Sequence, residues 1–239
     1  MKKCVVVSSG GLDSSTVLYI AKDQGYSIYS LSFIYGQRHF VEIEMAKQQA
    51  ILVGAKEHRI IPLPTPKGSA LTDNNIEVPL GRNLEELSIE IPPTYVPARN
   101  TLFIAYALQF AEEIGAEAIF TGITSVDASP YPDTRPEYVR AWQELINKAT
   151  KQTVQGKSIE LISPLLHLYK SETIEIGMSL GVDYSKTWSC YIGGTEPCLS
   201  CDSCVLRIKS FIEAGYRDPA VSEERWNKVV ENWNKEKLK

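Results

Sequence analysis

The chain has 239 residues, of which 44% are hydrophobic, and its 25 basic and 29 acidic side chains give a formal net charge of −4. This composition is typical of a globular protein and excludes disordered and fibrous classes. The length allows one large domain, or one domain with an appended module. The acidic balance provides no general attraction for a polyanion, so we expect no nucleic-acid partner.

The first residues contain only a short apolar run, from Cys4 to Val7, which is too short for the core of a signal peptide. No stretch approaches the roughly 20 apolar residues that span a bilayer. We therefore expect a cytoplasmic protein with no membrane partner. In that compartment clustered cysteines hold a metal more often than they form disulfides.

Apolar runs alternate with helical patterns along most of the chain. Strands are predicted at residues 5–7, 27–35, 58–63, 117–121 and 159–162, and helices at 14–22, 41–53, 100–111, 137–151 and 204–214, with a last helix from 218 onward. Strands separated by helices of about ten or more residues indicate βαβ units and a mostly parallel sheet. The sequence therefore predicts the α/β fold class.

Two irregular segments and one apolar stripe stand out from this pattern. Residues 62–97 hold seven of the 13 prolines and are expected to form a folded-over loop or lid, and residues 122–136 are a second irregular segment after a strand. Such segments are where α/β proteins place their sites. On the last helix Trp226, Val229, Val230 and Trp233 form a stripe that we expect to pack on the body or on a second subunit.

A glycine-rich turn, Ser9-Gly10-Gly11-Leu12-Asp13-Ser14, lies between the first strand and the first helix. Backbone N–H groups at such a turn, together with the positive end of the helix, can hold an anion. Two glycines allow close approach of the main chain to a phosphate, and serines add hydroxyl donors. We therefore predict a nucleotide-binding stretch comprising Ser8, Ser9, Gly10, Gly11, Leu12, Asp13, Ser14, Ser15, Thr16, Val17 and Leu18.

Four of the five cysteines, Cys190, Cys198, Cys201 and Cys204, fall close together near the C-terminus. Four thiolates on turns can close a tetrahedral shell around Zn²⁺ and would leave no open position for catalysis. An iron–sulfur cluster also takes four thiolates, and disulfide exchange is a further alternative. We favour a structural zinc, and we expect Cys4 to be a small buried residue of the first strand.

Three further strings carry polar side chains after predicted strands. They contribute Gln37, Arg38 and His39, then Arg99 and Asn100, then Asp127, Tyr131, Asp133, Arg135 and Glu137. Together they predict a substrate pocket with both cations and carboxylates. Guanidinium groups match phosphate or carboxylate, whereas Asp127, Asp133 or Glu137 could accept from an amino-pyrimidine edge.

The string Ser-Gly-Gly-x-Asp-Ser after an N-terminal strand resembles the pyrophosphate loop of the ATP pyrophosphatase superfamily. The chain as a whole resembles the 7-cyano-7-deazaguanine synthase family over roughly residues 1–215. Besides this loop, the resemblance is carried by residues 35–39, 96–103, 131–137, 163–165, Lys170 and the segment from Thr187 to Cys204. Many relatives have Gln in place of Leu12, Cys in place of Thr134 and Gly in place of Leu199. The threonine implies that no thiol is needed at its position.

The resemblance implies a Rossmann-like core of the adenine nucleotide alpha hydrolase type, one structural zinc per chain, and commonly a homodimer. It implies a core at residues 1–185, with the zinc-binding loop and C-terminal helices at 186–239. The implied activity converts 7-carboxy-7-deazaguanine, ammonia and ATP, the last with Mg²⁺, to the nitrile. Asp13, Arg99 and Lys170 are then the expected catalytic residues. A tRNA-modifying enzyme of the same superfamily, or a nucleotide-binding module without turnover, are the alternatives.

Overall fold

The apolar run that begins the chain forms the central strand of a parallel sheet. A computed structural model describes residues 1–82, 90–126 and 130–237, and its five strands lie in the order β3-β2-β1-β4-β5, all parallel. The strands are β1 Lys3–Val7, β2 Ser27–Ile34, β3 Glu57–Pro62, β4 Ala118–Phe120 and β5 Glu160–Ile162. This topology confirms the predicted α/β, Rossmann-like class.

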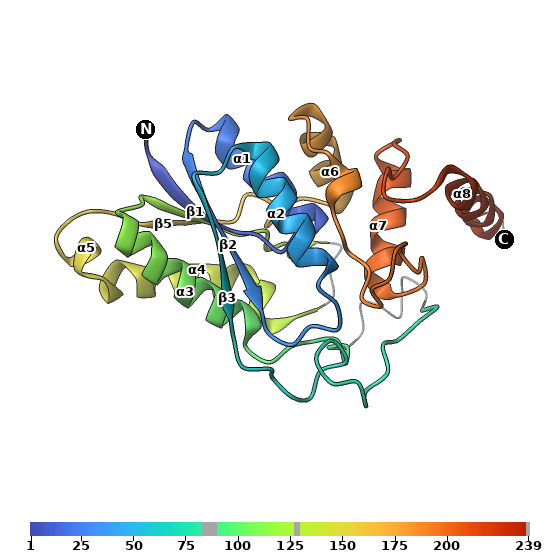
Figure 1. Ribbon diagram of the computed structural model, residues 1–239, viewed down its shortest axis with the longest axis horizontal. Coiled ribbons are helices and arrows are strands. Elements are labelled where there is room, and N and C mark those ends of the chain that lie inside the picture. The colour runs from blue at the N-terminus through green and yellow to red at the C-terminus, as the bar shows by residue number, and fades with distance from the viewer. Residues whose placement is uncertain (83–89, 127–129, 238–239) are drawn as a thin grey trace.

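Helices cover both faces of this sheet. They are α1 Leu12–Asp23, α2 Val41–Val53, α3 Arg99–Ile114, α4 Pro136–Ala149, α5 Lys151–Val154, α6 Lys170–Ser179, α7 Asp202–Glu213 and α8 Glu223–Lys237, with short 3-10 turns at Pro132–Thr134 and Tyr184–Lys186. Helices α1 and α2 lie on one face, and α3 and α4 lie on the other (Figure 1). Within the described ranges, no helix combines the length and apolar character that crossing a membrane requires.

Alternation along β1 explains the two layers. Cys4 and Val6 are fully buried in a cluster with Val17 and Leu18 of α1, whereas Val5 packs in the cluster built around α3 and α4. Burying each aliphatic side chain of this size stabilises the fold by about 1.5–3 kcal/mol. Cys4 is buried as predicted, and burial raises the pKa of its thiol to about 12.

The strand order predicts a crevice at the carboxyl edge of the sheet, next to β1. The chain leaves β1 toward β2 on one side, and β4 pairs with β1 on the other side. The connections that follow β1 and β4 therefore run in opposite directions from the carboxyl edge of the sheet, which is where open α/β sheets bind ligands.

Several helix ends differ from the sequence prediction. Helix α3 begins at Arg99 behind Ala98, which has φ 51, one residue before the predicted start at Asn100. The predicted helix 137–151 is interrupted at Thr150, whose extended backbone caps the short α5. The last helix begins at Glu223, not at Asp218. Asp218 is instead buried as the partner of Arg207, and it accepts from the N–H of Ala220 in the turn that precedes the helix.

Helix α6 was not predicted, and it connects the sheet to the C-terminal part. One apolar cluster joins Leu12 of α1 and Ile174 of α6 with Phe211 of α7 and Trp226 of α8. Partly buried Val229 and Val230 pack against the same cluster. The predicted stripe on α8 therefore packs on the body at these positions, and α7 and α8 share a core with the helices of the sheet.

The proline-rich segment after β3 folds over the cysteine region, as Figure 1 shows for the teal stretch below α7. Leu80 forms an antiparallel bridge with Cys201, and Arg82 pairs with the buried carboxylate of Asp202. Arg38 donates to the backbone carbonyls of Ala70, Asp73 and Ile76 in the middle of the segment. Residues 62–82 of the segment are thus anchored at their middle and at their C-terminal end.

Candidate active site and metal centre

The glycine-rich turn lies at the carboxyl end of β1 and opens α1. The backbone N–H of Ser9 donates to the hydroxyl of Ser14 over 3.1 Å, which closes the turn. Gly10 has φ 78, and a Cβ there would lie 2.1 Å from the carbonyl oxygen of Glu42, so the turn packs directly on α2. Gly11 caps α1 without a side-chain hydrogen bond. The first N–H groups of α1 are therefore placed to meet an anion.

The predicted nucleotide-binding stretch divides into two sets. The residues that line the cavity above the turn are Ser8, Ser9, Gly11, Leu12, Asp13 and Ser14. Gly10 faces α2, and Ser15, Thr16, Val17 and Leu18 are fully buried. Thr16, for example, lies 2.7 Å from the hydroxyl of Tyr184. The residues of the second set therefore support the turn by packing against the rest of the protein and do not face the cavity.

Lys170 and Asp13 meet at the rim of this turn. The ammonium group of Lys170 donates to both carboxylate oxygens of Asp13 at 2.8 and 2.7 Å. Asp13 belongs to the first turn of α1 and Lys170 begins α6, and both line the cavity. The Lys170 ammonium, held by Asp13, therefore lies beside the first N–H groups of α1.

The cavity at the carboxyl edge of the sheet has a volume of about 310 Å³, at the lower end of the range for small-molecule sites. Aromatic side chains form much of its wall: Phe33, Tyr35, Phe103, Tyr131, Trp188 and Tyr191. The rings of Phe33 and Phe103 stack with centroids 4.1 Å apart. Flat apolar walls of this kind suit a planar heterocycle.

Arg99 and Glu42 supply charge to the same wall. Arg99 donates to the hydroxyl of Tyr35 over 3.2 Å, and its guanidinium lies 5.7 Å and 5.9 Å from the ring centroids of Tyr35 and Phe103. Glu42 belongs to the first turn of α2, faces Arg99 and is hydrogen-bonded to the Gln37 side chain. Burial raises the pKa of Glu42 to about 7, against the lowering effect of Arg99.

Sequence reasoning missed Glu42. A glutamate in the first turn of a helix is ordinarily stabilised by the helix dipole and needs no other role. The available signal was its position: α2 follows β2 at the same edge of the sheet as the glycine-rich turn.

Three predicted substrate residues follow β2 and lie beside the cysteines. Gln37 accepts from the N–H of Tyr35 and donates to the carbonyl of Phe33, so it fixes the end of β2. His39 lies 3.0 Å from the carbonyl oxygen of Cys190, and burial lowers its pKa. Arg38 uses its guanidinium on carbonyls of the proline-rich segment. All three line a smaller cavity of about 60 Å³, which Glu42 and Arg99 also border.

Of the remaining predicted substrate residues, some line the main cavity and others do not. Asn100 and Tyr131 line the main cavity. Asp133 is buried and accepts from the N–H of Asn100 over 3.3 Å, so it caps α3. Arg135 and Glu137 face each other at 3.9 Å with more than half of each side chain exposed. The cavity wall given by the described residues does not include these last three side chains, and Asp127 lies outside the described residues.

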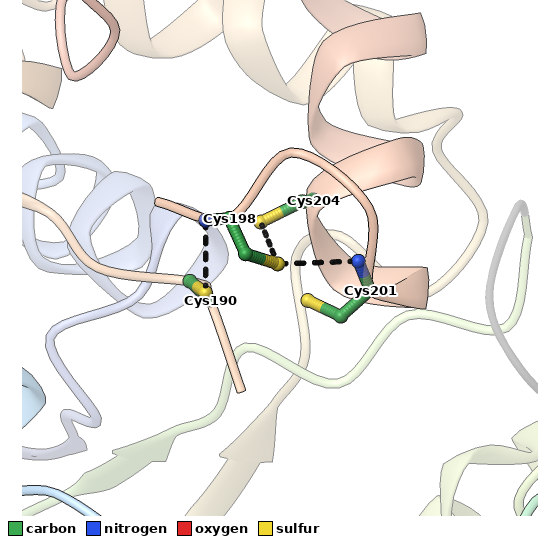
Figure 2. A group of neighbouring side chains, drawn as sticks. All are labelled: Cys190, Cys198, Cys201 and Cys204. Carbon is green, nitrogen blue, oxygen red and sulfur yellow. Dashed lines mark hydrogen bonds between the residues drawn. The ribbon is translucent and has the colours of Figure 1, made fainter. Parts of the chain in front are cut away.

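The four clustered cysteines converge from three parts of the chain (Figure 2). Cys201 and Cys204 lie at the start of α7, Cys198 lies in the loop before it, and Cys190 comes from the segment after the Tyr184–Lys186 turn. Their four sulfur atoms lie within 4.8 Å of one another, and those of Cys198 and Cys204 are 3.9 Å apart. A tetrahedral Zn–S₄ centre with bonds near 2.3 Å requires sulfur separations of ~3.8 Å.

Backbone donors around the cluster favour thiolates. The N–H groups of Ser200 and Cys201 point to the sulfur of Cys198 at 3.5 and 3.3 Å, and the N–H of Cys198 points to the sulfur of Cys190 at 3.3 Å. Leu199, between them, has φ 63. This left-handed conformation favours glycine, so Leu199 holds a strained backbone position between the ligands. The donor set therefore fits a metal ion held by four thiolates.

Comparison with known proteins agrees with these features. A family model described as "Queuosine biosynthesis protein QueC" matches residues 3–215. The 7-cyano-7-deazaguanine synthase of Trichodesmium erythraeum is 50% identical over 91% of this chain and 99% of its own length. That of Desulfitobacterium hafniense is 52% identical over 92% of each chain. The chain belongs to the QueC family. This confirms the resemblance found in the sequence. The protein is therefore a ligase that forms C–N bonds.

Solved structures resemble the chain more distantly. The NMN synthetase of Francisella tularensis covers 95% of this chain with a TM-score of 0.47 and 17% identity. A likeness at this level carries no argument about function.

Proposed function

We propose that this protein converts 7-carboxy-7-deazaguanine and ammonia to 7-cyano-7-deazaguanine with ATP. The observation that supports the proposal most strongly is the cavity itself, in which an anion-binding turn and an aromatic wall meet at one edge of the sheet. The family membership agrees with this substrate, because the curated relatives are named for the same product.

The chemistry needs ATP because a carboxylate is a poor electrophile. ATP converts one carboxylate oxygen into a leaving group, and ammonia displaces it to give the amide. A second ATP activates the amide oxygen, and loss of the two N–H protons together with departure of the activated oxygen leaves the C≡N bond. No nucleophilic side chain is needed, so the protein contributes positioning and charge stabilisation.

We assign these tasks to the residues around the turn. The N–H groups at the start of α1 and the serines of the turn would hold the phosphates, with Mg²⁺ carried on the nucleotide. Lys170 would neutralise charge that develops on them, and Asp13 would orient Lys170 through the bonds described above. Arg99 and the aromatic wall would hold the deazapurine.

The cysteine cluster is proposed to hold one structural zinc. Bound zinc would supply a crosslink between the start of α7 and the segment that carries Cys190. That segment includes Trp188 and Ser189, which line the cavity, so the crosslink would fix one wall of the active site. Four thiolates complete the coordination shell, which excludes substrate from the metal.

A homodimer is proposed on the family resemblance, and a cytoplasmic location on the sequence predictions given above. Size-exclusion chromatography with light scattering tests the first, and fractionation of the source cell tests the second.

The substrate assay tests the proposal. Purified protein with ATP, ammonium and 7-carboxy-7-deazaguanine should give the nitrile, identified by mass. Nucleotide turnover that leaves the acid unchanged would overturn the assignment. Salt-sensitive, tight binding of tRNA would favour a tRNA-modifying activity, and ATP binding without pyrophosphate release would favour a binding module.

A further inference from the structure

The cavity wall contains a carboxylate whose place in the fold suits a second partner. Glu42 borders both the main cavity and the smaller one, among the aromatic side chains. It faces Arg99, and its recorded hydrogen bond is to the Gln37 side chain. A carboxylate has about four lone-pair sites, so these contacts leave much of its accepting capacity unused.

The other acidic candidates are occupied elsewhere. Asp13 is held by Lys170, Asp133 caps α3, and Glu137 lies outside the cavity. Among the described residues, Glu42 is therefore the carboxylate in the cavity wall that remains available to a ligand.

Glu42 and Arg99 together present hydrogen-bond acceptors and donors to the cavity. The two carboxylate oxygens accept, and the neighbouring guanidinium donates. An amino-pyrimidinone edge presents the complement: an exocyclic N–H donor, a ring N–H donor and a carbonyl acceptor. An adenine edge presents a donor beside an acceptor, and its ring nitrogen would face a carboxylate oxygen without a proton between them.

We propose that Glu42 is the specificity residue of this cavity, accepting from the exocyclic amino group and ring N–H of an amino-pyrimidinone while Arg99 donates to its carbonyl oxygen. The inference rests on the proposed function, and it identifies the edge of the substrate that the protein reads. The first turn of α2, which carries Glu42, contacts the glycine-rich turn at Gly10. The reading site and the phosphate site are therefore held in a fixed relation.

Burial agrees with this role. The raised pKa of Glu42 shows that the ionised carboxylate is poorly compensated by the protein alone. Two N–H donors from a ligand would replace the hydrogen bonds to water that the Glu42 carboxylate loses on burial.

The test compares 7-carboxy-7-deazaguanine with its analogue that lacks the 2-amino group. In the unaltered protein kcat/KM should be about 10- to 100-fold lower for the analogue, as for other bidentate readings of a base edge. Glu42→Gln places an amide N–H₂ against the donor edge, so its rate on the amino substrate should fall while its rate on the analogue falls little. The preference should then shrink to below about threefold. Glu42→Asp, which keeps the charge and withdraws it by one methylene, should lose part of the preference.

Glu44→Gln is the matched control, because Glu44 lies in the same helix with an exposed side chain. It should keep the full preference. A preference that persists in both Glu42 variants would overturn the inference, as would pyrophosphate release from GTP that requires Glu42, since the edge read would then belong to the nucleotide. Failure of the unaltered protein to convert the amino substrate would instead refute the proposed function.

Discussion

Two arginines of this molecule each lie near a carboxylate, and both arginines border the main cavity. Arg207 of α7 forms an ion pair with Asp218, and both are almost completely buried. The Arg207 guanidinium donates to both oxygens of Asp218 and also to Thr187, Ser189 and the carbonyl of Tyr184. Arg99 and Glu42 interact electrostatically in the cavity wall, where Arg99 donates to the hydroxyl of Tyr35.

The difference separates a structural pair from a binding pair. A buried ion pair is tolerated when hydrogen bonds satisfy its remaining donors and acceptors, as around Arg207. A pair whose hydrogen-bonding capacity is partly unused costs stability in the empty protein and gains its partners when a ligand binds. We therefore expect changes near Arg207 to affect folding and changes near Glu42 to affect recognition.

The cysteine cluster should give the largest effect on folding. Cys201→Ala removes one thiolate of the proposed zinc site, and we expect loss of bound metal together with loss of soluble folded protein. Elemental analysis and size-exclusion chromatography measure the two results. Cys4→Ala, in the sheet and far from the cluster in the sequence, should keep the metal. A folded Cys201→Ala protein with a full complement of zinc would contradict the assignment, and iron with visible absorbance would replace it.

Asp218→Ala should come next, because it leaves the buried Arg207 charge without its carboxylate. We expect the free energy of unfolding to fall by about 3–5 kcal/mol. Urea unfolding followed by circular dichroism measures it. Glu224→Ala breaks an exposed pair with Lys228 and should change the free energy of unfolding far less, because solvent screens the pair. Equal losses in the two variants would remove the structural distinction drawn here.

Lys170→Met should act on turnover and not on folding. Removing the positive charge beside the phosphates should lower the rate of pyrophosphate release by about 100-fold or more. The zinc content and the urea midpoint should stay close to those of the unaltered protein. Lys186→Met serves as a control, since Lys186 lies in an exposed turn before the cysteine segment. A Lys170→Met protein with unchanged turnover would exclude the proposed role.

Glu42→Gln should change stability in the favourable direction, and only at neutral and higher pH. Because the folded protein raises the pKa of Glu42 from 4.5 to about 7, this group's contribution to stability is present below pH 4.5 and is lost as the pH rises through 7. The variant should therefore be more stable by about 1–3 kcal/mol at pH 8, with the gain vanishing below pH 4.5. Urea midpoints across this pH range measure it. A loss of stability at pH 8 would show that Glu42 is a structural residue.

The sequence predicted most elements because their signals are local. The helix at Val41–Val53 has the bounds that its pattern predicts, and all five strands lie where apolar runs placed them. Helix α6 was missed, since its burial is decided by contacts with α1 and α7. The start of α8 was misplaced because Asp218 is engaged by an arginine of another helix, which no local pattern reveals.

For the site, the sequence identified candidate residues, but it did not show which of their side chains face the cavity. The glycine-rich turn, Lys170, Arg99 and Tyr131 all line one cavity. The predicted acidic partners Asp133 and Glu137 do not, because a carboxylate on a loop can equally cap a helix or pair with a neighbour. These alternatives have the same sequence signal and differ only in packing.

By itself the sequence determined the α/β class, the anion-binding turn and the four-cysteine set, because each depends on the spacing of residues close together in the chain. Only the tertiary structure decided that Glu42 faces the cavity, that Arg38 serves the proline-rich segment, and that Arg207 is satisfied by the protein itself. Burial and hydrogen-bond partners determine these roles, and they arise where distant segments of the chain pack together.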